Sequence, residues 1–209
     1  MTATVTAALG FTVKSGWTSA VVLAGTAAQP ELVAAARLEL SDPADADACQ
    51  PYHDGFATMR TEGPALARLL ASVTTFGRRE VRNWIRMQRK NGYTLRGSAI
   101  VVGSLIDPRT IGNEHIRIHA MEGQLFRGVI ADACEGEDLP RLFVRQRDLF
   151  QQAKTTLRMP EAHIENRLAG MGKGRDGPWR AEHKMAALGA WLVLAGGVKQ
   201  DRPETKLDR

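Results

Sequence analysis

The sequence predicts an α/β fold in which a mixed sheet is flanked by helices. Two observations carry this prediction. Residues 8–40 contain three strand-like segments joined by short turns, and the rest of the chain alternates segments of helical periodicity with short apolar runs. Three opening antiparallel strands followed by alternating helices and strands are typical of a single sheet with helices on its faces.

The three opening strands follow from turns and alternation. LGFTV (9–13) and TSAVVLAG (18–25) flank Gly16, which permits a tight hairpin turn. Residues 33–40 alternate with a period of two, so we interpret them as a third antiparallel strand despite their alanine content. Residues 41–51 are polar and contain proline, which predicts a loop.

The remaining elements alternate. Apolar residues at spacings of three and four predict a helix over residues 64–91, which we expect Gly77 to break or kink. The apolar run 98–105 predicts a buried strand, and the next helix starts at Asn113 as its N-cap and extends to residue 139. We further expect a short strand within 140–150 and helices over 160–172 and 179–196.

Composition places the chain among ordinary globular proteins. It has 209 residues, of which 44% are hydrophobic, enough for one domain over residues 1–198, with 199–209 as a charged, disordered tail. Cys49 and Cys134 have no paired spacing, which fits a reducing compartment and argues against a thiolate metal site. Because we see neither a signal peptide nor a membrane-spanning run, we expect a cytoplasmic protein with no membrane partner.

Charge suggests the kind of partner. The net charge is +5 and the isoelectric point is about 9.6. A basic chain favours nucleic acid or an anionic small molecule as partner, although charge alone does not identify either.

Three stretches, in order along the chain, resemble the ribonuclease H-like superfamily, in its RuvC-like (Holliday-junction-resolvase-type) branch. They are LGFTVKSGWTSAVVL, SAIVVG and HKMAALGAWLVL, which correspond to the first hairpin, the fourth strand and the closing helix. The resemblance implies the mixed sheet described above. Four further stretches, KSGW, PYH, HIRIHAMEGQLFR and GPWRAEHK, resemble segments of bacterial proteins, which implies no particular chemistry.

The resemblance also locates the positions of the family's metal-binding carboxylates. In such nucleases, carboxylates from the first strand, the fourth strand and the last helix converge on divalent metal ions. Here these positions fall near Thr12, near Val102 or Gly103, and at Glu182 and His183, and no acid lies between Gly10 and Gly25. Because a two-metal site needs several oxygen ligands, a metal-dependent nuclease of the resolvase type is disfavoured.

The helix that begins after Asn113 carries the richest group of polar residues. His115, His119 and Glu122 have spacings of four and three, so they share one helix face. They are candidate catalytic residues, as an acid–base group or as metal ligands. Because no third or fourth ligand is evident elsewhere, we assign no metal, and the sequence leaves any cofactor unknown.

The alternative is that these histidines only face solvent or bond to the backbone. We expect the trio to be dispensable for the core, since four apolar residues of the same helix can face the sheet instead. These are Ile116, Ala120, Leu125 and Val129.

Further candidates for ligand binding lie at strand and helix ends. Lys14 closes the first strand and can bind a phosphate or act as a base, and Trp17 can stack on a ring. Both also fit an ordinary hairpin with an exposed lysine and a packed tryptophan. Four other residues add polar or charged groups near the expected site: Arg117, Arg127, Glu182 and His183.

A basic ridge is the candidate nucleic-acid-binding surface. Its residues recur every four positions along the long helix: Arg78, Arg82, Arg86 and Lys90. Such a ridge can follow a phosphate backbone, or it can be the solvated face of an amphipathic helix.

Three hypotheses for function remain open. The first is a ribonuclease H-like domain without the nuclease carboxylates that binds nucleic acid or a nucleotide-like anion. The second is an enzyme with a rebuilt site formed by Lys14, His115, His119 and Glu122. The third is a non-catalytic partner-binding protein, and a homodimer is compatible with each hypothesis.

Overall fold

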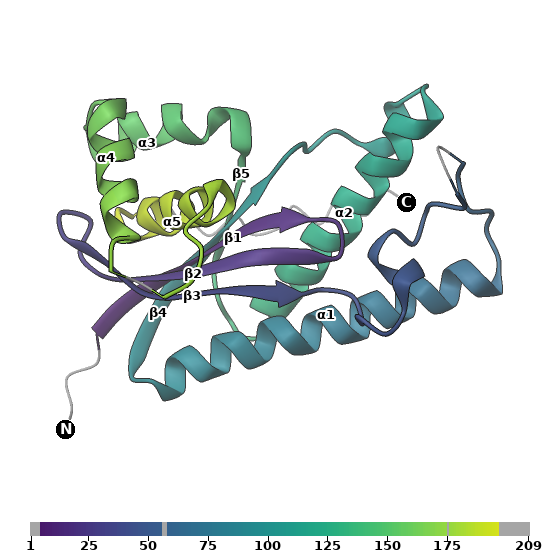
Figure 1. The fold of residues 1–209 in the computed structure, drawn as a ribbon, viewed down its shortest axis with the longest axis horizontal. Helices are drawn as coiled ribbons and strands as arrows, with labels where there is room; N and C mark the ends of the chain where they lie inside the picture. Colours follow the sequence, from purple (N-terminus) through teal and green to yellow (C-terminus); the bar gives the residue numbers. More distant parts are fainter. Residues whose placement is uncertain (1–4, 56–57, 175, 197–209) are drawn as a thin grey trace, which may run out of the picture.

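The computed structural model describes residues 5–55, 58–174 and 176–196. Within these ranges one sheet of five strands has the order β3-β2-β1-β4-β5 and is covered by helices on both faces, which confirms the predicted fold class (Figure 1). The tail expected over residues 199–209 lies outside the described part.

The first three strands form an antiparallel meander, as predicted. β1 (Val5–Lys14) and β2 (Trp17–Gly25) pair up to Lys14 opposite Trp17, and Gly16 adopts φ +77° in the turn between them. β2 then pairs with β3 (Pro30–Glu39). β4 (Tyr93–Val102) runs parallel to β1, and β5 (Arg141–Arg145) runs parallel to β4. The carboxyl ends of β1, β4 and β5 therefore meet at one edge of the sheet.

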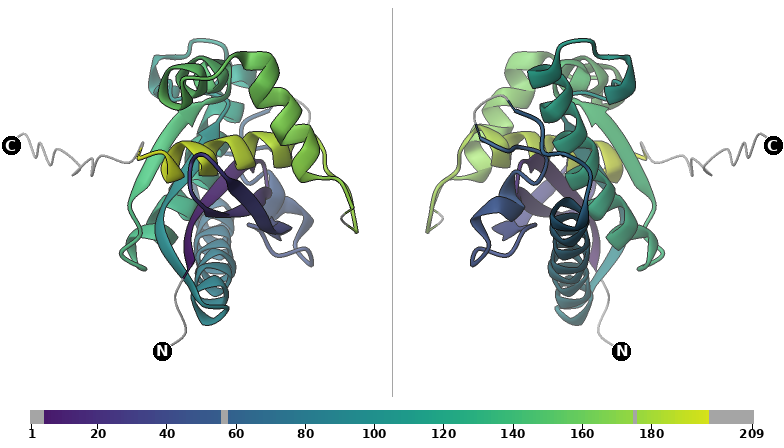
Figure 2. Two further views of the ribbon diagram at one scale, coloured as in Figure 1. Left: turned by 90° about the vertical axis from the view of Figure 1, so that its left-hand side faces the viewer. Right: turned by 90° about the vertical axis from the view of Figure 1, so that its right-hand side faces the viewer.

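Helices form a layer on each face (Figures 1 and 2). α1 (Pro64–Lys90) and α2 (Glu114–Glu135) share one core cluster with Leu9, Phe11 and Ile100 of the sheet. The opposite core cluster contains α5 (Ala181–Leu194), together with residues of α3 (Leu149–Leu157) and α4 (Glu161–Met171). α5 is apolar on nearly every side, as expected of a helix enclosed by a sheet and other helices.

Two glycines permit close packing between these layers. A Cβ atom at Gly10 in β1 would lie 1.8 Å from the carbonyl oxygen of Ala186, so α5 can cross β1 only at a glycine. A Cβ atom at Gly77 would lie 2.8 Å from the carbonyl oxygen of Leu40. The predicted break at Gly77 is wrong, because α1 continues through this residue and uses it to approach its neighbours.

The sequence missed one helix and several short turns. The strand predicted within 140–150 ends at Arg145, and a 3₁₀ turn, η3 (Gln146–Asp148), leads directly into α3. Two more 3₁₀ turns, η1 (Ala46–Cys49) and η2 (Pro108–Thr110), lie between the predicted helices and strands. α2 ends at Glu135 rather than at residue 139. No helix among the described residues is long and apolar enough to cross a membrane.

Candidate functional site

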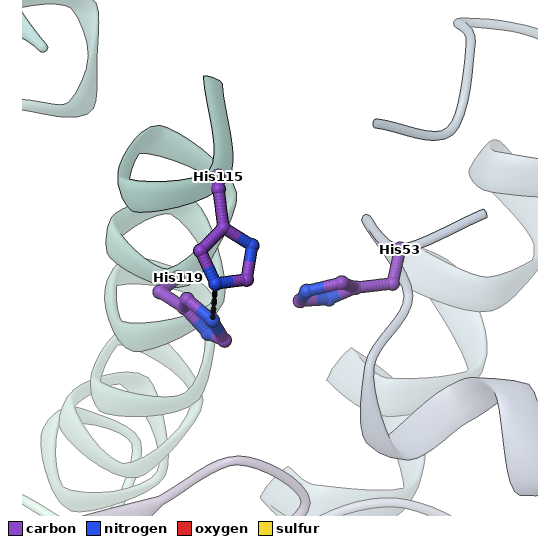
Figure 3. A group of neighbouring side chains, drawn as sticks. All are labelled: His53, His115 and His119. Atoms are coloured by element: carbon purple, nitrogen blue, oxygen red, sulfur yellow. Dashed lines mark hydrogen bonds between the residues drawn. The ribbon is translucent and has the colours of Figure 1, made fainter. Parts of the chain in front are cut away.

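Three histidines from two parts of the chain meet at one place. His115 and His119 lie on the first turns of α2, and His53 faces them from the loop between η1 and α1 (Figure 3). One ring nitrogen of each histidine lies within 4.8 Å of the others. The Nε2 atoms of His115 and His119 are 3.3 Å apart. The sequence predicted the helical pair, but it did not single out His53.

Local contacts fix the two halves of this cluster. The Asn113 side chain caps α2 by accepting a hydrogen bond of 3.0 Å from the amide of Ile116, which confirms the predicted N-cap. On the loop, Arg60 donates to the carbonyl oxygens of Pro51 at 3.1 Å and of His53 at 2.8 Å. The backbone of His53 also forms a bridge with Met59. These hydrogen bonds fix the backbone of the loop at His53.

Glu122 lies beside His53 and His119 and is fully buried. Its Oε1 is 2.7 Å from Nδ1 of His53, and its Oε2 accepts a hydrogen bond of 3.4 Å from the hydroxyl of Ser15. The Nδ1 of His119 is 3.9 Å from Oε2. The carboxylate thus connects the β1–β2 turn, the loop and α2.

The burial of Glu122 corrects the expected orientation of α2. Ile118, Glu122, Phe126 and Val129 form its buried stripe, whereas Ile116 is 56% exposed. The predicted inward positions are wrong for Ile116 and right for Val129. The cause is a rotation of the helix that turns the polar Glu122 toward the sheet, where His53 and Ser15 provide hydrogen bonds.

Burial dominates the electrostatics of this carboxylate. Burial raises the pKa of Glu122, while the hydrogen bond and the charge of His53 act in the opposite direction. Burial and the negative charge of Glu122 together raise the pKa of Cys49 and of Tyr52. Among the described residues, Glu122 forms no ion pair with a lysine or arginine. Arg60 lines the same cavity as His53, but its guanidinium pairs with the carboxylates of Asp47 at 3.5 Å and of Asp54 at 3.7 Å instead.

The histidine cluster is accessible from one side. His53, His115 and His119 line a cavity of about 640 Å³ together with Cys49, Gln50 and Arg60. The side chain of His53 is 13% exposed and that of His119 is 48% exposed. A ligand bound by the three ring nitrogens would therefore remain in contact with solvent.

A second pocket, here called the strand-end pocket, adjoins the first through His119. It has a volume of about 430 Å³, and Lys14, Ser15 and Val102 place it at the carboxyl ends of β1 and β4. Three isoleucines contribute its apolar part: Ile106, Ile111 and Ile116. Ligands of open α/β sheets commonly bind at such strand ends.

The strand-end pocket contains two cations without carboxylate partners in the described chain. These are Lys14 and Arg127, both half-buried. Arg127 donates a hydrogen bond of 3.4 Å to the carbonyl oxygen of Ser104, and burial lowers its pKa. The pocket thus brings together two of the predicted ligand-binding residues, both of which are positively charged.

The other predicted ligand-binding residues lie elsewhere. Trp17, Glu182 and His183 line a separate pocket on the α5 side of the sheet. The guanidinium of Arg37 stacks on the Trp17 ring at 4.1 Å from its centroid. Arg117, on α2, is not among the residues that line either pocket around His119. Lys14 and Arg127 therefore lie in one pocket, whereas Trp17, Glu182 and His183 lie in another on the opposite face.

Two of the positions that the family resemblance singled out, Thr12 and Glu182, come together on the α5 side, whereas Val102, the fourth-strand position, packs in the opposite core and lines the strand-end pocket. Thr12 pairs with Val101 of β4, and its hydroxyl donates a hydrogen bond of 2.9 Å to the carbonyl oxygen of Glu182. A hydroxyl therefore occupies the first-strand position. Its neighbours Phe11 and Val13 face the opposite core, where α1 and α2 pack. The histidine cluster thus lies on the other side of the sheet from Thr12 and Glu182.

The basic ridge packs against the end of α2. Arg78 forms an ion pair with Asp132, and Arg86 donates a hydrogen bond of 2.8 Å to the buried Glu137. Arg82 lies 4.0 Å from Glu137, and Arg89, which is outside the predicted ridge, bonds to it at 2.9 Å. Three of the four predicted phosphate contacts are therefore already engaged with carboxylates. Lys90 is exposed.

Comparison with solved structures relates this arrangement to a known fold. The structure of Thermus thermophilus RuvC superposes with a TM-score of 0.53 at 10% sequence identity, covering 92% of this chain and 98% of that one. The chain has the RuvC-type ribonuclease H-like fold. T. thermophilus RuvC in complex with a Holliday junction substrate gives a TM-score of 0.54 at 11% identity, with 93% and 98% covered. No protein-family model and no curated protein matches the sequence.

Proposed function

We propose that this RuvC-type domain binds a phosphate-bearing ligand, a nucleic acid strand or a nucleotide, in the strand-end pocket. The observation that carries the proposal is the pair of cations there, Lys14 and Arg127, neither of which forms an ion pair with a described residue. An anion between them would compensate both charges.

Physical chemistry favours a phosphate at this point. A half-buried guanidinium without an anionic partner is costly, and a phosphate can accept parallel hydrogen bonds from its planar donor set. Lys14 adds a second positive charge across the pocket. The neighbouring side chains of Ile106 and Ile116 are 58% and 56% exposed. They offer an apolar surface against which the flat face of a base can pack.

The fold comparison supports nucleic acid as the ligand class. One of the similar RuvC structures contains a Holliday junction substrate, so a protein of this fold binds branched DNA. We do not extend the resolvase reaction to this chain. That reaction needs several carboxylates around divalent metal ions, and the first-strand position here is the hydroxyl of Thr12.

The test is a titration of the untagged protein with a fluorescein-labelled single-stranded oligonucleotide, followed by anisotropy. We expect Lys14→Ala and Arg127→Ala each to weaken binding by about tenfold or more, because each removes a charge-assisted contact. Arg96→Ala is the matched control, because Arg96 is an exposed arginine in the first half of β4, away from the carboxyl ends of the strands where the pocket lies. The proposal fails if both pocket variants bind like the wild type, or if Arg96→Ala weakens binding equally.

A specific observation also favours a second candidate, an enzyme with a rebuilt site. His53 is oriented by the buried Glu122 through its Nδ1, the arrangement that holds an imidazole as a general base. His119 connects this pair with the strand-end pocket, where Lys14 lies. Phosphodiester hydrolysis, measured with bis(4-nitrophenyl) phosphate, should then be lost in His53→Ala. Absence of turnover by the wild type, or unchanged turnover in the variant, would reject this candidate.

A further inference from the structure

We propose that His53, His115 and His119 bind a divalent transition-metal ion of the zinc type, with Glu122 as the partner that orients His53. Two of these ligands, His115 and His119, were predicted from their spacing on one helix, and no third was evident. The loop before α1 supplies the third ligand, and with it a group of donors that no comparison assigns. This inference does not depend on the strand-end pocket.

The spacing of the nitrogens fits a small four-coordinate ion. With Zn–N bonds of about 2.0–2.1 Å, two nitrogens of a tetrahedral site lie about 3.3–3.4 Å apart. The Nε2 atoms of His115 and His119 are 3.3 Å apart. The third ring lies across the cavity, with its centroid 5.0 Å from that of His119 (Figure 3). A small movement of His53 would complete the set, since all three ligand atoms already lie within 4.8 Å of one another.

The second, independent observation is the buried carboxylate. Metal-bound histidines commonly donate their other ring N–H to a carboxylate, which fixes the ring and strengthens the ligand. Nδ1 of His53 lies 2.7 Å from Oε1 of Glu122, which leaves Nε2 for a metal. Glu122 has no exposed surface and no lysine or arginine partner in the described chain. A divalent cation bound by the histidines would supply the missing positive charge.

The donor set selects the kind of metal. Three neutral imidazoles suit zinc and its neighbours among the transition metals, whereas magnesium prefers oxygen ligands in an octahedron. The cavity of about 640 Å³ leaves one side of the cluster open. Three protein ligands with an open position are typical of zinc sites that bind water or a substrate rather than purely structural sites.

The experiment uses untagged, chelator-treated protein and two probes, zinc alone by calorimetry and cobalt alone by visible absorption. We expect one zinc ion per chain and the intense visible bands of four-coordinate cobalt. His53→Ala and His119→Ala should each weaken zinc binding by at least about 100-fold, and Glu122→Gln by about 10–100-fold. A thousandfold excess of magnesium should not displace cobalt.

His163→Ala is the matched control, because His163 is an exposed histidine on α4, on the opposite side of the sheet. Far-ultraviolet circular dichroism in chelator checks that each variant is folded. If His119→Ala does not fold, His115→Ala, which removes another exposed ring, replaces it. The proposal is overturned if the wild type binds less than one zinc ion per chain, or if the cluster variants bind zinc as tightly as His163→Ala.

Discussion

Glu122 is the residue on which the architecture of the candidate site depends. Its carboxylate is fully buried and accepts hydrogen bonds from a loop histidine and from the serine of the first hairpin. When a buried hydrogen-bond acceptor loses its partner, the free energy spent on removing it from water is no longer compensated, and the folded state is destabilised. Removing a residue that contacts Glu122 should therefore lower the free energy of unfolding more, the shorter the hydrogen bond that this residue forms with the carboxylate.

We expect alanine substitution of two histidines in the same cluster to lower the free energy of unfolding by different amounts. His53→Ala removes the 2.7 Å partner of Glu122 and should lower the free energy of unfolding by about 1–3 kcal/mol. His119→Ala removes a side chain that is 48% exposed and 3.9 Å from the carboxylate, and it should cost less than about 1 kcal/mol. Urea unfolding in the presence of a chelator measures both. A cost for His119→Ala that equals or exceeds that of His53→Ala would contradict the assignment.

Among the residues of the site, those on α2 could be predicted from the sequence, whereas His53 and the burial of Glu122 could not. The helical repeat placed His115, His119 and Glu122 on one face, because positions three and four apart are neighbours on any helix. Patterning could not show that Glu122 is buried, since it assigns apolar residues to the core. His53 lies in an irregular loop, where no periodicity relates it to α2.

At the scale of elements, the contact between α1 and α2 explains the basic ridge. Glu137, which follows α2, is 8% exposed and accepts hydrogen bonds from Arg86 and Arg89 of α1. The arginines of this helix therefore join two helices, whereas the sequence presented them as a free cationic surface. Their partners could not be identified from the sequence, because the crossing of α1 and α2 decides which acids lie opposite.

We predict that Glu137→Gln lowers the free energy of unfolding by about 1–3 kcal/mol, because it weakens two charge-assisted hydrogen bonds at a buried position. Glu135→Gln is the matched control: Glu135 has a 63% exposed side chain and contacts Arg141 at 3.1 Å. That change should stay within about 0.5 kcal/mol. Thermal and urea unfolding of both variants give the comparison. Equal effects would show that the ridge is only a solvated face.

The same scale shows why one helix was missed. α1 was predicted from its apolar spacing and α2 from its N-cap Asn113, and both helices are long. α3 has nine residues and follows β5 after a single 3₁₀ turn. The segment PRLFVRQRDLF therefore covers a strand and a helix start without a glycine between them, and a short apolar run does not distinguish the two.

For the whole molecule, the two faces of the sheet carry different polar groups. The α5 face holds Thr12 and Glu182, two of the positions that the family resemblance singles out, and these are joined by a side-chain-to-backbone hydrogen bond. The α2 face holds the histidine cluster, Glu122 and the strand-end pocket. We propose that the chemistry of this chain lies on the α2 face of a mixed sheet whose fold class the sequence predicted correctly.

Anomalous diffraction at the zinc edge tests this assignment most directly, using crystals of the untagged protein grown with one equivalent of zinc per chain. We predict one strong peak, bonded to ring nitrogens of His53, His115 and His119, and none beside Thr12 and Glu182. A peak beside Thr12 and Glu182, or the absence of a peak among the three histidines, would contradict it.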